Sequence, residues 1–305
     1  MDAVYLLTQL LNGLQLGVML FLMAAGLTLV FGIMGLLNLA HGSLYMVGAY
    51  LAAAFQAWTG SFLLALLLAL PCTVLVGIAV EVIALRRLYD RDHLDQVLAT
   101  FGLILFFNEL VRILFGPQAL FMAVPAALAG QIEILPGFPY PAYRLAITAT
   151  GLAVALFLAW LIRRTRLGML IRAGAANREM VGAMGVNIAF LFTVVFGLGA
   201  ALAGLAGMMA GPILAIQPGM GETILILTFV VVVIGGLGSI KGAFVAALLV
   251  GLVDTFARAL LPFVLTAFLS PQAVATAAPA LASMAIYILM AAVLLWRPRG
   301  LLPGA

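Results

Sequence analysis

The sequence has few of the residues on which soluble proteins and enzymes depend. Only 8% of its 305 residues are charged, and it has one cysteine and two histidines. Soluble domains carry about 25% charged residues. The single cysteine, Cys72, excludes a disulfide within the chain. The histidines and the cysteine show none of the spacings typical of a metal site, so we expect no metal and no cofactor.

Motifs for nucleotide hydrolysis, catalysis and secretion are also missing. The stretch 235–242, GGLGSIKG, is rich in glycine but lacks the Gly-Lys-Ser/Thr ending of a Walker A loop. The sequence shows no combination of nucleophile, general base or metal ligands that would predict an enzyme. The N-terminus, MDAVYLLTQL, has no basic region before its apolar run, so a cleavable signal peptide is not expected.

What the chain has in excess is apolar residues. It is 66% hydrophobic and has a mean hydropathy of +1.29, which no soluble fold could bury. Short polar gaps between long apolar runs favour helices over a barrel. The sequence therefore predicts an all-α, polytopic transmembrane bundle of about eight to ten spans, with broken helices, as a single domain over 1–305 in contact with membrane lipid.

Nine crossings fit the hydropathy pattern. The segment 116–143 contains five prolines and is predicted to be a loop with a short surface helix. The expected helices cover 4–30, 38–58, 62–85, 96–115, 144–162, 188–210, 222–234, 242–261 and 280–296.

The basic residues predict the orientation of the chain. Cytoplasmic loops are enriched in lysine and arginine, and eleven of the fourteen basic residues fit one side of the membrane. This places the N-terminus outside and the C-terminus in the cytoplasm. It also accounts for the net charge of +4, so nucleic acid is not an expected partner. The eleven are Arg86, Arg87, Arg91, Arg163, Arg164, Arg166, Arg172, Arg178, Lys241, Arg297 and Arg299.

Polar residues interrupt the apolar stretch Gly26–Tyr50. Asn38 and His41 lie in its middle, where an amide and an imidazole are costly unless protein or a watery path surrounds them. One interpretation is a helix, a break near Asn38–Gly42 and a second helix, with the polar residues on a translocation pathway. The other is a surface loop in which Asn38 caps a helix.

An internal repeat involves the same stretch. Residues 27–42 align without gaps to 227–242, within repeat-like segments 27–48 and 227–248. Matched, glycine-interrupted segments in two halves point to a transport pathway. The aligned identities are Leu27/Leu227, Thr28/Thr228, Val30/Val230, Gly35/Gly235, Leu37/Leu237 and Gly42/Gly242. The candidate pathway residues are Asn38, His41, Gly42, Ser43 and Gly242.

The segment 163–187 is the longest polar stretch of the chain. It is basic and amphipathic, with small residues at 173–176 that leave room for close docking. Such a segment suits a short helix that inserts into a groove on a partner. On composition alone, a solvated loop or a helix lying at the membrane surface fits as well.

Three motifs resemble one known family. They are NLAHGSLYMVGAY at 38–50, RAGAANREMVGAMGVN at 172–187 and VVVVIGGLGSIKGAFVAALLVGL at 230–252. In order and spacing they are similar to the LivH-type permease subunit of the branched-chain amino acid ABC importer family. The resemblance implies two cytoplasmic ABC ATPases, a second, LivM-like permease and a periplasmic solute-binding protein, in the bacterial inner membrane.

The resemblance also implies that 172–187 is the coupling helix that touches an ATPase. Glycines and polar residues of this motif become the candidates for ATPase coupling. They are Arg172, Asn177, Arg178, Glu179, Gly182 and Gly185.

The substrate and two other function classes stay open at this point. Many members of the family have Glu after His-Gly, whereas this chain has Ser43. Urea, short amides and aromatic or hydrophobic carboxylates are alternatives to branched-chain amino acids, although the absence of an extra domain favours an amino acid. One alternative is a self-sufficient secondary transporter or channel, which would transport without partners. The other is an intramembrane enzyme, which the absence of a nucleophile or metal set in this sequence disfavours.

Overall fold

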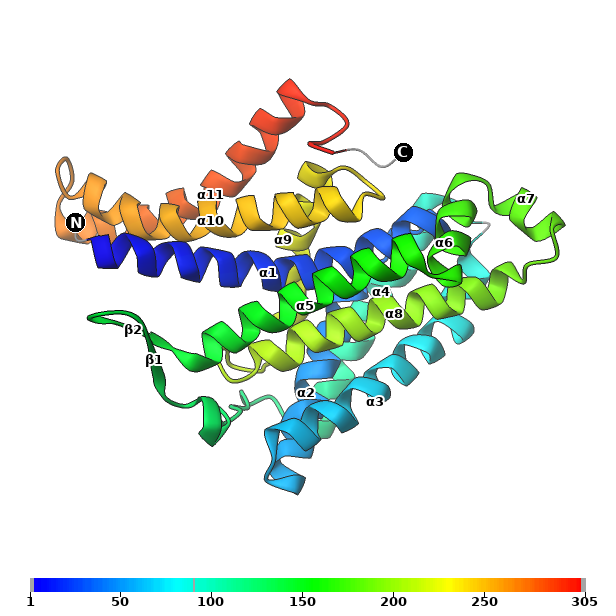
Figure 1. Ribbon diagram of the computed structural model, residues 1–305, viewed down its shortest axis with the longest axis horizontal. Coiled ribbons are helices and arrows are strands. Elements are labelled where there is room, and N and C mark those ends of the chain that lie inside the picture. The colour runs from blue at the N-terminus through cyan, green and yellow to red at the C-terminus, as the bar shows by residue number, and fades with distance from the viewer. Residues whose placement is uncertain (1–2, 90, 303–305) are drawn as a thin grey trace. The chain divides into compact units, whose positions relative to one another are not determined.

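The computed structural model describes residues 3–89 and 91–302, and these are mostly helical (Figure 1). The all-α prediction is confirmed. The α-helices are α1 Ala3–Met34, α2 His41–Thr59, α3 Phe62–Ile83, α4 His93–Phe115, α5 Ala142–Arg164, α6 Arg166–Ala176, α7 Arg178–Ala183, α8 Ile188–Ala210, α9 Met220–Gly235, α10 Ile240–Leu265 and α11 Pro271–Trp296. Short 3-10 helices lie at Leu85–Leu88 and Ala126–Leu128, and two strands at β1 Gln131–Leu135 and β2 Phe138–Pro141.

Seven of the described helices are long and apolar enough to cross a membrane, namely α1, α3, α4, α5, α8, α10 and α11. Two further predicted spans are helical but fall outside this group, because α2 is less apolar and α9 has only 16 residues. Residues 41–50 of α2 are all buried by protein, so their polar side chains do not meet lipid. The chain is a multi-pass membrane protein.

The helices form two compact units, each assembled from separate stretches of chain. Of the described residues, unit 1 holds 3–24, 126–152 and 228–302, and unit 2 holds 25–125, except 90, and 153–227. Helices α1, α5 and α9 each begin in one unit and end in the other. The prediction of a single domain over 1–305 stays a prediction.

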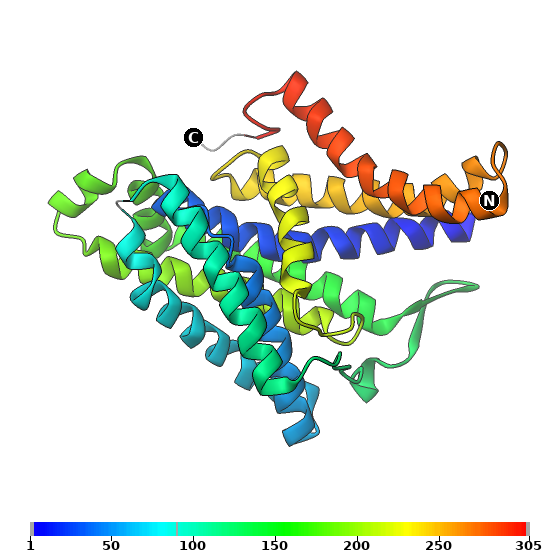
Figure 2. The ribbon, with the colours of Figure 1, turned by 180° about the vertical axis from the view of Figure 1, so that it is seen from behind.

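Unit 2 is organised around α2, which contacts α3, α4 and α8 (Figure 2). Glycines let these helices approach closely: a Cβ atom added to Gly48 of α2 would lie 2.6 Å from the Cα of Gly204 on α8. Gly207 of α8 lies against the carbonyl of Tyr45. The core of this unit includes Met46, Tyr50, Phe107, Val111, Met122, Met208 and Ile216.

Unit 1 contains the contacting helices α10 and α11 and the first part of α1 (Figure 1). A Cβ atom added to Gly13 of α1 would lie 2.9 Å from the side chain of Leu252 on α10. On the same part of α1, Asn12 Oδ1 accepts hydrogen bonds from the Tyr140 hydroxyl at 3.0 Å and from Arg144 at 2.7 Å. These bonds tie β2 and the start of α5 to α1.

Both copies of the repeat form a helix, a break and a second helix. The first break covers 35–40 and the second 236–239. The second copy has a side-chain cap, because Ser239 Oγ accepts a hydrogen bond from the Gly242 N–H at 3.0 Å. In the first copy Ala40 precedes α2 and provides no side-chain cap. The two breaks therefore share a position in the repeat but differ in how their second helix begins.

The segment before α5 differs from its prediction as a loop with a short surface helix. It has one 3-10 turn but also an antiparallel β-hairpin, in which Gln131 pairs with Pro141 and Gly137 adopts a φ of +77° at the turn. Its prolines made a strand unexpected, since proline cannot donate to a ladder. In a two-stranded sheet each strand is an edge, where proline is tolerated.

Three ion pairs join acids to arginines three to five residues further along the described chain. The pairs are Glu109–Arg112 at 3.4 Å, Asp254–Arg258 at 2.9 Å and Glu81–Arg86 at 3.0 Å. The first two have the i,i+3 and i,i+4 spacings at which side chains meet on one face of a helix. The Glu109 pair is exposed on both sides, whereas the side chain of Glu81 is fully buried.

Glu81 is the centre of a hydrogen-bond network at the end of α3. Its carboxylate accepts bonds from Arg86, from the Tyr89 hydroxyl at 2.6 Å and from the Thr193 hydroxyl at 2.8 Å. Burial, followed by the bond to Glu81, raises the pKa of Tyr89, so this hydroxyl stays a neutral donor. The ring of Tyr89 meets Phe192 edge-on at 5.2 Å. The network joins the end of α3 to the first turns of α8.

We expect Glu81→Gln to lower the thermal unfolding midpoint of the purified protein. Glutamine removes the charge that Arg86 pairs with and leaves buried donors unsatisfied, which costs about 1–3 kcal/mol. Glu109→Gln is the matched control, because an exposed pair contributes only about 0–1 kcal/mol. Equal midpoints for the two variants would show that the network around Glu81 does not stabilise the fold.

Candidate functional site

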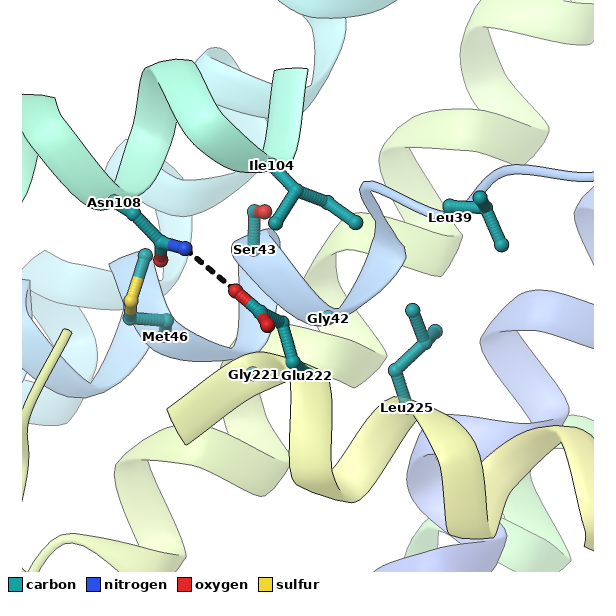
Figure 3. A pocket seen from close by; sticks show the side chains of 9 residues that line it. All are labelled: Leu39, Gly42, Ser43, Met46, Ile104, Asn108, Gly221, Glu222 and Leu225. Atoms are coloured by element: carbon teal, nitrogen blue, oxygen red, sulfur yellow. Dashed lines mark hydrogen bonds between the residues drawn. The ribbon is translucent and has the colours of Figure 1, made fainter. Parts of the chain in front are cut away.

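A small cavity in unit 2 lies where α2, α4 and α9 meet (Figure 3). No part of it is wide enough for a water molecule in this structure. Apolar and polar side chains share its wall. The lining residues are Leu39, Gly42, Ser43, Met46, Ile104, Asn108, Gly221, Glu222 and Leu225.

The polar part of the cavity centres on Glu222 and Asn108. Asn108 Nδ2 donates a hydrogen bond to Glu222 Oε1 at 2.6 Å, drawn as the dashed line in Figure 3. The Gly219 N–H donates to Asn108 Oδ1 at 3.1 Å, which fixes the orientation of the amide. Glu222 lies in the first turn of α9, and within the described residues its hydrogen-bonded side-chain partner is the amide of Asn108 on α4.

Two glycines close one side of the cavity. Gly42 at the start of α2 and Gly221 at the start of α9 lie backbone to backbone, and a Cβ atom on either would overlap the carbonyl of the other. Only glycine allows this approach. Of the residues predicted for the pathway, the structure brings Gly42 and Ser43 to this cavity.

Asn38 is buried beside the uncapped start of α2 and does not line the cavity. Its side chain is fully buried, and neither Oδ1 nor Nδ2 has a hydrogen-bond partner within the residues that the structure describes. Asn38 is thus not the cap of α2. A buried amide without partners costs about 1–3 kcal/mol, so groups of this kind in native proteins call for an explanation such as bound water or function.

The other two predicted pathway residues have packed surroundings. The imidazole of His41 is fully buried, and a Cβ atom added to Gly26 of α1 would lie 2.9 Å from it. Gly242 belongs to unit 1, where it lies against Gly235 and the carbonyl of Leu302. Across residues 3–89 and 91–302, no group of three or more His, Cys, Asp or Glu residues is placed to hold a metal ion.

The predicted coupling residues lie on the α6–α7 segment, residues 166–183, and on the turn that follows it. α6 is anchored by small residues, since a Cβ atom added to Gly174 would lie 3.0 Å from Ile33. Asn177 separates the two helices and caps α7 by accepting a bond from the Met180 N–H at 2.9 Å. Gly185 adopts a φ of +87° in the turn after α7. Arg172 instead donates to the carbonyl of Ile162.

α7 lies between two hollows of unit 2. One hollow of about 810 Å³ is lined by Asn177, Arg178 and Glu179 together with the end of α1 and the start of α4. The other, of about 420 Å³, is lined by Arg178, Glu179 and Gly182 together with Tyr89 and the start of α8. The side chains of Met180 and Met184 are exposed. The segment therefore presents charged and apolar groups on an accessible, hollowed surface.

Comparison with known proteins extends across both the cavity and this segment. The family described as the permease component of branched-chain amino acid transport systems matches residues 9–294. BraD of Pseudomonas aeruginosa, a high-affinity branched-chain amino acid transport system permease protein, is 32% identical, with 82% of this chain and 85% of BraD covered. LivH proteins of the same description from Escherichia coli and Salmonella typhimurium are 30% and 29% identical, with 84% of this chain and 87% of each relative covered. The resemblance found in the sequence motifs is confirmed, and the chain belongs to the family of branched-chain amino acid transport permeases.

Proposed function

We propose that this chain is a translocating subunit of an ATP-driven importer for branched-chain or related hydrophobic amino acids. Its partners are two cytoplasmic ABC ATPases, a second, LivM-like permease and a periplasmic solute-binding protein. The complex lies in a bacterial inner membrane, with the N-terminus of this chain in the periplasm and its C-terminus in the cytoplasm. The similarity to BraD and LivH, which are named as branched-chain amino acid transport permeases, supports the substrate class.

The observation that carries the proposal is the α6–α7 segment. It stands outside the long apolar helices, its charged residues line two hollows, and its methionines are exposed. An exposed helix with apolar anchors and charges suits docking against another protein. In this role Arg172, Asn177, Arg178, Glu179, Gly182 and Gly185 form the ATPase coupling surface.

The proposed mechanism is alternating access. Nucleotide-driven movement of an ATPase displaces α7, and the helices around 27–48 and 227–248 open the pathway to one side and then to the other. A ligand shifts such an equilibrium only through its different affinities for the two states, so the loaded binding protein prefers the outward-open state. The pathway of this chain includes Asn38, His41, Gly42, Ser43 and Gly242. Gly42 and Ser43 line a cavity that is too narrow for a water molecule in this structure.

Reconstitution tests this function directly. In proteoliposomes that hold the permeases, the ATPases and the binding protein, we expect leucine uptake that requires ATP and all subunits. Excess valine or isoleucine should compete with leucine, whereas urea and benzoate should not. Uptake by this chain alone, driven by an ion gradient, would instead identify a secondary transporter. Competition by urea or benzoate would move the substrate to another class.

A further inference from the structure

Glu222 differs from three acids of the membrane helices in having no arginine partner. Glu81, Glu109 and Asp254 each pair with an arginine. Within the described residues Glu222 forms no ion pair, and its one hydrogen-bonded side chain is the amide of Asn108. No cationic side chain in the part of the chain that the structure describes therefore pairs with this carboxylate.

Its neighbour lies well inside a membrane-spanning helix. Asn108 precedes the end of α4 at Phe115 by seven residues, which corresponds to about 10 Å at 1.5 Å per residue. Glu222 is exposed on the surface of this chain. An unpaired carboxylate at such a depth does not face lipid, so this surface faces protein or a water-filled path.

The cavity combines this carboxylate with aliphatic side chains. Ile104 and Leu225 lie to one side of the Asn108–Glu222 hydrogen bond, and Ser43 lies close to it (Figure 3). A carboxylate beside an aliphatic wall complements a ligand with a cationic group on an aliphatic body. Asn108 holds the carboxylate in place without neutralising it, because the amide is itself fixed by the backbone of Gly219.

We infer that Glu222 and Asn108 form an ammonium subsite for an aliphatic amino acid in transit. The ammonium group donates to the carboxylate of Glu222, and the aliphatic side chain of the substrate packs against Ile104 and Leu225. The site is occupied only while the pathway is open, since the contact of Gly42 with Gly221 keeps the cavity too narrow for a water molecule in this structure. This inference rests on the proposed function and adds a residue that touches the substrate.

The test compares four transporters in proteoliposomes with ATP and the binding protein: wild type, Glu222→Gln, Glu109→Gln and the double variant Glu222→Gln with Asn108→Asp. Glu222→Gln should lower kcat for leucine uptake by about tenfold or more, an effect typical of losing an interaction with the moving substrate. KM should not change, because the binding protein captures the substrate. Glu109→Gln, an equal change one residue from Asn108, should leave kcat within about twofold of wild type.

The double variant separates a substrate contact from a structural role. It places a carboxylate on α4 in place of the one on α9, and it should recover most of the lost uptake. Wild-type kcat in Glu222→Gln would overturn the inference, and so would a failure of the double variant to recover. Complex assembly and basal ATP hydrolysis report folding in each case. A wild-type complex without ATP-driven uptake would refute the proposed function itself, which is a distinct result.

Discussion

Replacing Arg178 by glutamate is expected to abolish the stimulation of ATP hydrolysis by the loaded binding protein while the permease still assembles. Arg178 is exposed, lines both hollows beside α7 and makes no ion pair in the described part of the chain. The substitution therefore breaks no ion pair among the described residues. At an interface with an ATPase, reversing a charge costs several kcal/mol, so stimulated hydrolysis should fall by about tenfold or more.

Arg164→Glu provides the matched control. It makes the same change of charge at the exposed end of α5, fourteen positions before Arg178 and outside the α6–α7 segment. Stimulated hydrolysis should stay close to wild type in this variant. The measurement is ATP hydrolysis by purified complex in lipid discs, with and without loaded binding protein. If both variants lose stimulation equally, the effect belongs to the general basic charge of this face and α7 is not the coupling element.

The sequence was a reliable guide to the membrane helices because lipid leaves the backbone few alternatives. A span must satisfy its own N–H and C=O groups, so a long apolar run predicts a helix. The helix predicted over 62–85, for example, corresponds to α3, which covers Phe62–Ile83. The largest error was the last helix, which begins at Pro271 and was expected from 280.

That error has an identifiable cause in the treatment of proline. Pro279 lies inside α11, and a proline in that position breaks most helices of soluble proteins. Membrane helices tolerate it because neighbouring groups satisfy the freed carbonyl. The true start carries a clear signal: Ser270 caps the helix by accepting a bond from the Ala273 N–H at 3.4 Å, and Pro271 occupies the first turn.

The candidate site was predicted in part, for a similar physical reason. Gly42 and Ser43 follow from the polar interruption of one apolar run, which is visible locally. Asn108 and Glu222 are 114 residues apart, and no periodicity of either helix indicates that they meet. The available signal was the amide of Asn108 in the middle of an apolar helix. Such a group requires a polar partner from another element.

Asn38→Leu is expected to make the protein more stable and the transporter slower. Leucine has the branched shape of asparagine without its polar atoms, and both polar atoms of Asn38 are buried without partners in the described structure. Removing such a group should raise the free energy of unfolding by about 1–3 kcal/mol. If the amide serves the passing substrate, the same change should lower the kcat of leucine uptake by about tenfold.

Asn12→Leu is the control, because the same substitution is expected there to change the free energy of unfolding in the opposite direction. The amide oxygen of Asn12 accepts bonds from Tyr140 and Arg144, so its loss leaves satisfied donors without a partner. This variant should lower the free energy of unfolding by about 1–3 kcal/mol, and uptake should fall only in proportion to the amount of folded protein. Thermal unfolding in detergent and uptake in proteoliposomes measure the two quantities separately. If Asn38→Leu destabilises the protein as Asn12→Leu does, or leaves uptake unchanged, then Asn38 has a structural role. The two variants are expected to change stability in opposite directions because the amide of Asn38 has no hydrogen bond to lose in the described structure, whereas the amide oxygen of Asn12 accepts two.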